Sequence, residues 1–350
     1  MIASTSAENP AQIGSEHQVP DTESISVVIP CYNEERFIGK ALQNLCNQYD
    51  NDSYEIIVVD GMSDDKTREV IEQFKQSHAA LSIRIVDNPA RDIPKALNLG
   101  IAAAKGEIIL RMDAHAVPSL GYVRRCADLV RGNSNSVIGA PCHVCPGAET
   151  LMARAIAVGV SHGFGIGDAK YRLRAGKAAQ EAVDTVAFGS FKKSLWQQLG
   201  GFNEELLTNE DYDFNYRVRA QGGLVLLDRS EHCDYFARTT LFELAAQYFR
   251  YGKWKARMLR LHPKSIRWRH FVAPLFVGSI IVLGMLGIVW HAAYLLLALE
   301  LTTYFSLGLL LGRQRGPDAV PLTLLMPIVF LTIHLSWGTS FFIGLVRPSK

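Results

Sequence analysis

Short apolar runs alternate with amphipathic segments along the front half of the chain. The apolar runs are nonpolar at successive positions, so both faces of each run are expected to be buried. The predicted strands are 26–30, 55–60, 83–87, 107–113 and 136–141, and the predicted helices are 35–48, 64–77, 93–104 and 119–131. Buried strands that are each followed by a helix indicate an α/β fold, in which helices cover both faces of a mostly parallel sheet.

The middle of the chain, from about residue 146 to 236, is less regular. The segment 159–176 is rich in glycine and basic residues, and we expect it to form a mobile loop. The predicted elements that follow are a strand at 185–188, a short helix after Ser194, a helix that carries Glu210 and Asp211, and a strand at 224–228. Residues 24–237 are therefore predicted to form the α/β domain.

The segment 238–269 combines a helical apolar pattern with positive charge. Apolar residues recur at helical spacing from Leu241 to Leu261, and eight lysines and arginines but no acid occur between Arg250 and Arg269. Because a long apolar stretch follows, this pattern predicts a basic amphipathic helix that lies on an anionic membrane surface. The alternative is a solvated, charged helix packed on the domain.

The C-terminal part, 270–350, is predicted to be a transmembrane region. Its three apolar stretches, 271–290, 292–311 and 321–346, are each close to or above the ~20 residues needed to cross the hydrocarbon core. Basic residues flank the first two stretches on both sides, so both ends of this hairpin are expected to face the cytoplasm. The third stretch contains Pro327 and either crosses once or bends back.

The N-terminal residues and the composition narrow the function classes. Residues 1–23 are polar and lack the apolar run of a secretory signal, so we expect a disordered tail and a cytosolic α/β domain. The net charge is only +2, and no basic stripe interleaved with aromatic residues is present, so nucleic acid is not an expected partner. The six cysteines are expected to be reduced. Cys142 and Cys145 have the spacing of zinc ligands but lack a second pair, which leaves a structural zinc as the minor alternative.

Polar side chains follow several of the predicted strands. Tyr32 and Glu34 come after the first strand, Asp60 ends the second, and Asp113 and His115 follow the fourth. Ligands of parallel α/β sheets bind at this carboxyl edge. Asp60 can accept hydrogen bonds from a uracil N–H or a ribose hydroxyl, with Tyr32 and Glu34 closing the pocket.

Three further sets of residues could carry chemistry. Asp113 and His115 are spaced so that both can reach one cation and its bound phosphates. An imidazole ligand favours Mn²⁺ over Mg²⁺. The alternative for His115 is a hydrogen bond within its loop. Asp211, beside Glu210, is the candidate general base, although paired acids also stabilise a helix N-terminus. Gln247, Arg250 and Tyr251 share a helical face that could meet a diphosphate or an acceptor sugar, and Arg250 could equally be an interfacial cation.

Several motifs together resemble the family 2 glycosyltransferases, which are inverting enzymes of the GT-A fold. They are VVIPCYNE at 27–34, VVDGMSDD at 58–65, and GSFKK at 189–193 with GGFNE at 200–204, shortly before Glu210-Asp211. The resemblance implies that Asp60 contacts the nucleoside, that Asp113 and His115 occupy the family's Asp-x-Asp metal position, and that Asp211 is the catalytic base. Gln247-x-x-Arg250-Tyr251 is similar to the Gln-x-x-Arg-Trp motif of processive members. The donor-binding set expected on this basis is Pro30, Tyr32, Glu34, Asp60, Lys95, Arg111 and Asp113.

Two departures refine the resemblance. The first is that His115 replaces the second aspartate of the metal position. The second is that Tyr251 replaces the tryptophan, and because only three apolar stretches follow, a polymer-conducting channel is not expected. The form Arg111-Met-Asp-Ala-His115 with the C-terminal hairpin most resembles the succinoglycan-type exopolysaccharide glucosyltransferases. These extend a lipid-linked oligosaccharide on the cytoplasmic face of the membrane.

The sequence is therefore interpreted as a membrane-anchored, inverting glycosyltransferase that uses Mn²⁺ or Mg²⁺. It is expected to move a hexose from a nucleotide sugar, with UDP-glucose as first candidate, to a lipid-linked saccharide in exopolysaccharide or envelope glycan synthesis. The expected location is the bacterial inner membrane, with the catalytic domain in the cytoplasm and segment 159–176 as a lid over the donor. The alternatives are a polyprenyl-phosphate sugar transferase and a non-catalytic nucleotide-sugar-binding membrane protein.

Overall fold

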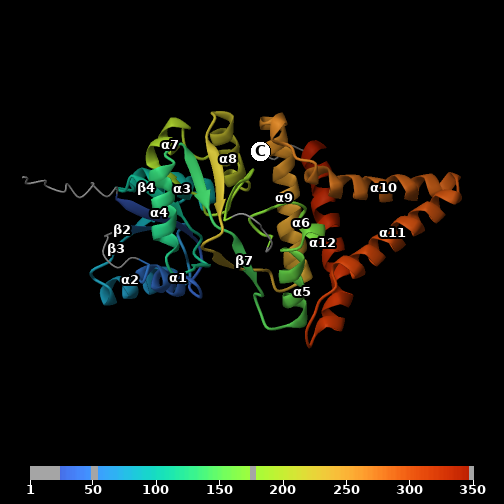
Figure 1. Ribbon diagram of the computed structural model, residues 1–350, viewed down its shortest axis with the longest axis horizontal. Helices are drawn as coiled ribbons and strands as arrows, with labels where there is room; N and C mark the ends of the chain where they lie inside the picture. The colour runs from blue at the N-terminus through green and yellow to red at the C-terminus, as the bar shows by residue number, and fades with distance from the viewer. Residues whose placement is uncertain (1–23, 49–53, 174–178, 347–350) are drawn as a thin grey trace, which may run out of the picture.

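The computed structural model describes residues 24–48, 54–173 and 179–346. Within them, eight strands form the main sheet in the order β3-β2-β1-β4-β9-β6-β10-β8 (Figure 1). The first four strands in this order are parallel, β9 is antiparallel to both its neighbours, β10 is parallel to β6, and β8 is antiparallel to β10. The bounds are β1 Ile25–Cys31, β2 Tyr54–Asp60, β3 Ser82–Asp87, β4 Ile108–Arg111, β6 Ser136–Gly139, β8 Gln180–Ala182, β9 Ser190–Lys192 and β10 Leu224–Asp228. The tail predicted at 1–23 lies outside the described residues.

Two hydrophobic cores lie on opposite faces of this sheet, because consecutive residues of a strand point to opposite sides. Val27 and Ile29 of β1 pack into one core with α1, α2 and α4, whereas Val28 packs into the other with α3, α7 and α8. The helix bounds are α1 Ile38–Cys46, α2 Thr67–Ser77, α3 Ile93–Ala103, α4 Tyr122–Gly132, α7 Lys193–Gln198 and α8 Glu210–Ala220. The predicted α/β fold with helices on both faces of a mostly parallel sheet is confirmed.

A second, smaller sheet has the order β5-β11-β7. Its bounds are β5 Ala116–Pro118, β7 Cys142–Cys145 and β11 Cys233–Phe236, and β11 is antiparallel to β5 and parallel to β7. Burial alternates along β7, where Cys142 and Val144 are buried while His143 is exposed and Cys145 is half-buried. Cys142 and Cys145 therefore point to opposite faces, because three residues separate them in a strand with a period of two. The pair cannot hold one zinc ion together, and that interpretation of its spacing is wrong.

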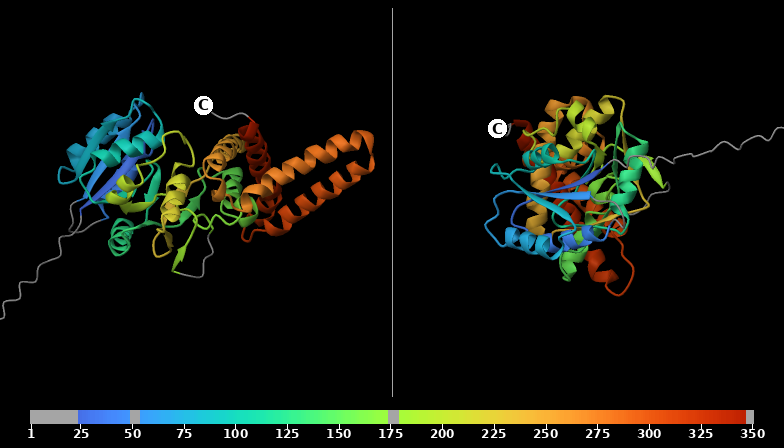
Figure 2. Two further views of the ribbon diagram at one scale, coloured as in Figure 1. Left: turned by 90° about the horizontal axis from the view of Figure 1, so that it is seen from above. Right: turned by 90° about the vertical axis from the view of Figure 1, so that its left-hand side faces the viewer.

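Within the described residues, three C-terminal helices are long and apolar enough to cross a membrane. They are α10 Arg269–Val289, α11 Ala292–Leu311 and α12 Ala319–Val346. Helices α10 and α11 form a hairpin that extends away from the α/β domain, whereas α12 runs beside α9 (Leu241–Leu261) at the base of the hairpin (Figures 1 and 2). Helix α12 continues through Pro327 without a break, so this stretch does not bend back.

Ion pairs attach the hairpin to the α/β domain. Arg269, the first residue of α10, lies 2.6 Å from Asp168 and also pairs with buried Asp184. Asp184 further accepts a hydrogen bond from the Tyr212 hydroxyl of α8. The first membrane-type helix therefore starts from a fixed point on the domain, directly beside α8.

Helix α9 packs along α12 through small residues. A Cβ atom at Gly252 of α9 would lie 2.2 Å from the carbonyl oxygen of Trp337, and one at Gly344 of α12 would lie 2.7 Å from that of Lys253. Lys255 of α9 is buried, and Arg257 pairs with Glu205 of the domain. Part of the predicted basic helix thus faces protein, and its contact with a membrane surface stays a prediction.

One local prediction in the middle of the chain is wrong. The strand expected at 185–188 is irregular, and the strand of this region is β9 at Ser190–Lys192, because Phe188 has a φ of 52° that interrupts an extended conformation. The expected mobile loop at 159–176 begins at the last residue of α5 (Leu151–Gly159) and contains one short helix, α6 at Gly163–Ile166, while its other described residues are turns or irregular; its mobility stays a prediction. Its glycines permit close packing, since a Cβ at Gly159 would lie 2.4 Å from Val329 of α12. Residues 174–178 of that segment lie outside the described residues.

We predict that Gly252→Ala destabilises the protein. The added methyl group would meet the Trp337 carbonyl oxygen and the Ser340 hydroxyl of α12, so the two helices must separate, at a cost of about 1–3 kcal/mol in the free energy of unfolding. Thermal unfolding in detergent should show a lower Tm. The matched control is Gly284→Ala in α10, where a Cβ has no neighbour within 4 Å. An equal Tm for both variants would contradict this account of the α9–α12 packing.

Candidate active site

One buried guanidinium holds three carboxylates where β4 ends and α8 begins. Arg111 Nη2 lies 3.1 Å from Asp113 Oδ1 and 3.5 Å from Glu210 Oε1, and its Nη1 lies 3.0 Å from Asp211 Oδ2. Arg111 is the last residue of β4, and the two acids are the first two residues of α8. The Phe188 ring covers the guanidinium, with its centroid 5.4 Å from Cζ. The arrangement joins the sheet edge and the helix N-terminus through Arg111.

Burial and mutual repulsion change the acidity of these carboxyl groups. Burial is the largest cause that raises the pKa of Glu210, and the charge of Asp211 raises it further, to about 8, although Arg111 opposes both. Burial also raises the pKa of Asp211, against the opposing charge of Arg111. Burial alone would lower the pKa of Arg111, but the three carboxylates outweigh it and hold the pKa above its usual range. Two adjacent carboxyls with raised pKa values in a cleft are typical of a site for proton transfer.

Strained backbone collects at the same edge. Within the described residues, the non-glycine positions with positive φ are Asn33, Met62, Arg91, Phe188 and Asn209. The first three follow β1, β2 and β3, and the last two precede β9 and α8. Asn209 has a φ of 71° and directly precedes Glu210 and Asp211 at the start of α8. Such conformations cost about 1–3 kcal/mol each, so their position around one edge indicates a functional constraint.

The residues after β4 fit a divalent cation. Asp113 and His115 are half-buried, and His115 Nδ1 lies 3.1 Å from Glu34 Oε1. Carboxylate oxygens with one imidazole nitrogen are donors that suit Mn²⁺ and, less well, Mg²⁺. In addition, three carboxyl groups surround a single guanidinium, and a cation beside Asp113 would add positive charge to this acidic set.

The residues expected at the nucleotide lie around this edge, where Asp60 is buried, Tyr32 is exposed, and Pro30, Glu34 and Lys95 are half-buried. The Asp60 side chain is fully buried and accepts hydrogen bonds from the backbone and hydroxyl of Ser63 and from Arg68 Nε at 2.6 Å. The Tyr32 ring lies beneath the guanidinium of Arg91, 5.2 Å from Cζ to the ring centroid. Pro30 is half-buried within β1, and Lys95 pairs with Asp92 at 3.4 Å. Their contact with a nucleotide stays a prediction.

A cavity of about 960 Å³ joins the carboxylates to the C-terminal helices. At one end it is lined by Arg111, Asp113, His115, Glu210 and Asp211. On the α9 side it is lined by Gln247, Arg250 and Tyr251, with Gln247 Nε2 donating to the hydroxyls of Tyr235 at 2.9 Å and Tyr251 at 3.0 Å. At the other end it is lined by residues of α10, α11 and α12, which include Phe276, Glu300, Thr303, Tyr304, Leu307 and Ile333. Pro30, Tyr32, Glu34, Asp60 and Lys95 do not line it.

A half-buried cation, Arg172, lines this cavity and was not predicted as a site residue. The guanidinium of Arg172 lies 5.5 Å from the Tyr171 ring centroid and 5.2 Å from that of Tyr235. Among the described residues it has no carboxylate partner, and its Nε has no hydrogen-bond partner. Arg238 and Lys255 line the same space. No local motif marks these residues, because the second sheet and α9 bring them together only in the folded chain.

Comparisons with known proteins agree with this geometry. Residues 26–197 match the family described as Glycosyl transferase family 2. The chain is 27% identical over 332 residues to the dolichyl N-acetyl-alpha-D-glucosaminyl phosphate 3-beta-D-2,3-diacetamido-2,3-dideoxy-beta-D-glucuronosyltransferase of Methanococcus voltae, which covers 93% of this chain and 98% of that protein. It is 26% identical over 336 residues to the succinoglycan biosynthesis protein ExoA of Rhizobium meliloti (strain 1021). This alignment covers 93% of this chain and 96% of that protein.

A solved structure shares the fold over nearly the whole chain. A mannosyltransferase from Pyrobaculum calidifontis, determined in complex with GDP-Man and Mn²⁺, superposes with a TM-score of 0.62 at 16% identity and covers 93% of this chain and 88% of its own. This likeness confirms the GT-A type of the α/β fold. The family match and the two relatives show that residues 26–197 form a Glycosyl transferase family 2 domain, so the chain is a glycosyltransferase.

Proposed function

We propose that this glycosyltransferase moves a hexose from a nucleotide sugar, with UDP-glucose as first candidate, to a lipid-linked saccharide. The observation that carries the proposal is the cavity that begins at Asp211 and continues between the C-terminal helices. A water-soluble acceptor would need only the domain end of such a space. An acceptor on a lipid would use both ends, with its sugar at the carboxylates and its hydrocarbon chain beside α10 and α11.

In the proposed reaction Asp211 accepts the proton of the acceptor hydroxyl as general base. The hydroxyl oxygen forms a bond to the anomeric carbon while the bond from that carbon to the donor phosphate breaks, and the nucleoside diphosphate leaves with the electron pair. The reaction inverts the anomeric configuration, as the resemblance to inverting enzymes implies. Arg111 positions Asp211 through its 3.0 Å contact and favours the ionised carboxylate that a base requires.

Asp113 and His115 are proposed to hold a divalent cation next to the donor diphosphate. When bound, Mn²⁺ or Mg²⁺ supplies positive charge to the departing phosphates. The mannosyltransferase with the same fold was determined with Mn²⁺, which supports this choice by analogy. Glu34 contacts His115 and is proposed to fix the orientation of its ring.

The cationic wall of the cavity supports an acceptor that carries phosphate. Arg172, Arg238 and Arg250 line one space, and Arg172 has no carboxylate partner among the described residues. A guanidinium without an acid is a suitable partner for a phosphate group. The same groups would also bind a polyprenyl phosphate that is itself the acceptor, so that reaction is the second candidate. One relative is named as a glucuronosyltransferase for a dolichyl N-acetyl-alpha-D-glucosaminyl phosphate and the other as a succinoglycan biosynthesis protein.

The three apolar helices associate the chain with a membrane. We propose the bacterial inner membrane, with the α/β domain on the cytoplasmic side. Arg267 and Arg269 at the start of the hairpin and Arg313 and Arg315 after it give both ends positive charge, which favours the cytoplasm. The supply of nucleotide sugars in the cytoplasm is consistent with this orientation.

Asp211→Asn should lower kcat about 10²–10⁴-fold for a sugar acceptor, because the amide cannot accept the hydroxyl proton. Transfer is measured by release of nucleoside diphosphate with a lipid-linked saccharide supplied, and donor affinity is measured separately by calorimetry. Asp128→Asn on the exposed face of α4 is the control and should retain wild-type kcat. Turnover of Asp211→Asn within a few fold of wild type would contradict the base assignment and favour a phosphate acceptor, which needs little base catalysis.

Leu307→Trp should raise the KM for a lipid-linked acceptor about tenfold or more while the KM for the donor stays unchanged. Leu307 lines the cavity between the C-terminal helices, and the larger indole would narrow the space proposed for the lipid. The matched control is Leu310→Trp on the same helix, because Leu310 is 67% exposed and does not line the cavity. The proposed lipid path is wrong if both variants show the same acceptor KM, or if Leu307→Trp changes only the donor KM.

A further inference from the structure

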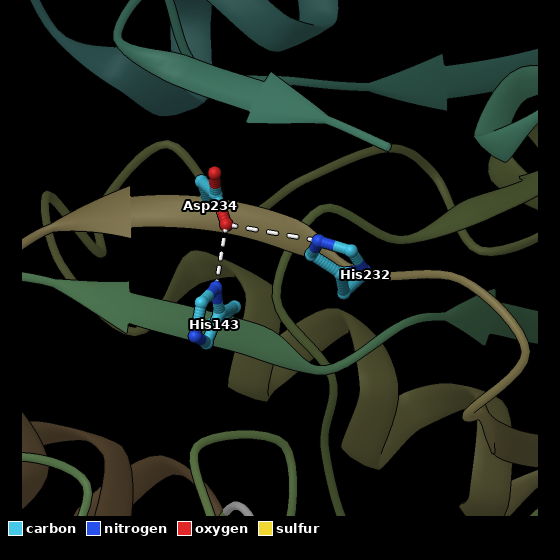
Figure 3. A group of neighbouring side chains, drawn as sticks. All are labelled: His143, His232 and Asp234. Carbon is cyan, nitrogen blue, oxygen red and sulfur yellow. Dashed lines mark hydrogen bonds and ion pairs between the residues drawn. The ribbon is translucent and has the colours of Figure 1, made fainter. Parts of the chain in front are cut away.

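We propose that His143, His232 and Asp234 bind a Zn²⁺ ion on the outer face of the small sheet, with Cys145 as the fourth ligand. The three nitrogen and oxygen donors lie within 4.8 Å of one another (Figure 3). This metal site is separate from the cation proposed at Asp113 and does not depend on the transfer reaction. It concerns the strands that support one wall of the cavity.

The strand register brings the four side chains to one face. β7 and β11 are parallel neighbours, and His143 lies directly opposite Asp234. His143 and Cys145 are two residues apart on one strand, and His232 and Asp234 are two residues apart along the other, so each pair points to the same side. The chain thus carries two ligand pairs, His-x-Cys and His-x-Asp, side by side. Neither pair has a conventional zinc spacing in the sequence, which is why only the paired strands reveal them.

The distances are near those of a tetrahedral site. His143 Nδ1 lies 2.8 Å from Asp234 Oδ1, His232 Nε2 lies 3.8 Å from the same oxygen, and Cys145 Sγ lies 3.9 Å from His143 Nδ1. Zinc–ligand bonds of about 2.0–2.3 Å place tetrahedral donors about 3.3–3.8 Å apart. Two of the three separations need only a small contraction, and the His143–Asp234 contact needs to open by about half an ångström.

A simple ion pair does not account for the whole cluster. A hydrogen bond to Asp234 would explain the position of His143, but His232 also approaches the same oxygen, and the two imidazole rings meet edge to face with centroids 5.6 Å apart. Two imidazoles, a carboxylate and a thiol are donors that select Zn²⁺ over Mg²⁺ or Ca²⁺. With the carboxylate and the thiolate ionised and both histidines neutral, the ligands also balance the charge of the ion.

The opposite face of the same two strands is a wall of the active-site cavity. Cys142 and Tyr235 line the cavity, and the Tyr235 hydroxyl accepts the hydrogen bond from Gln247. None of the four proposed ligands lines the cavity. A zinc ion that joins β7 to β11 therefore cannot contact the donor, and its expected role is to hold these strands, and with them Tyr235, in place.

The test is the zinc content of the full chain, purified in detergent without a polyhistidine tag. After equilibration with Zn²⁺ and dialysis into zinc-free buffer, the wild type should retain about one zinc per chain by mass spectrometry of the metal. The double variant His143→Gln/His232→Gln should lose the zinc. The control variant His78→Gln should keep it, because His78 directly follows α2 and is not part of this sheet. The single variant His232→Gln gives a second test if the double variant fails to fold, since His232 is exposed and precedes β11.

Two further variants separate this site from the catalytic edge and test the thiol. Zinc retained by Asp113→Asn at the wild-type level supports the proposal, whereas its loss would place the ion at Asp113 and overturn it. With Co²⁺ in place of Zn²⁺, the wild type should show a thiolate-to-metal absorption band that Cys145→Ser loses. No retained zinc in the wild type, equal zinc in the histidine variants, or no thiolate band would each overturn the site as described.

Discussion

The contact of Arg111 with three carboxylates is the interaction on which the site depends. It joins the end of β4 to the first turn of α8, and it places the proposed base and the proposed cation ligand on one buried group. Removing one partner of such a buried ionic set costs about 3–5 kcal/mol, because the remaining charges lose their compensation. Burial and the charge of Asp211 raise the pKa of Glu210 to about 8, so one guanidinium does not offset both effects on this carboxyl group. A cationic ligand is therefore expected to complete the set.

The membrane-type helices extend this site rather than simply anchor it. Arg269 of α10 pairs with two aspartates of the domain, and α12 packs along α9, so the hairpin has a fixed position relative to the carboxylates. In the most apolar window of α12, 39% of residues are buried, against 11% for α11. The two helices have similar hydropathy, yet α12 buries much more of its surface, chiefly against α9 and also against α5 and α10. The cavity exists because this packing leaves space between the domain and the base of the hairpin.

Much of the fold follows from the sequence, because β1, β2 and β4 are apolar on both faces and each is followed by a clear helix or turn. The polar residues at their ends mark the site edge for the same reason. Three features could not be predicted, since each depends on contacts between distant segments. They are the position of β9, which inserts antiparallel between β4 and β6, the half-buried Arg172, and the approach of His143 on β7 to His232 just before β11. The motif at Cys142 and Cys145 misled because spacing alone does not reveal which strand face a residue occupies.

The most direct test of the account is sugar transfer by the detergent-solubilised chain to a defined lipid-linked oligosaccharide. Radiolabelled UDP- and GDP-sugars would each be supplied with Mn²⁺, Mg²⁺ or EDTA, and label would be counted in the organic-soluble fraction. The account predicts that label from one donor enters the lipid fraction with a divalent cation and not with EDTA. Label that stays in free sugar or unchanged donor under every condition, despite a folded protein that binds nucleotide, would contradict it.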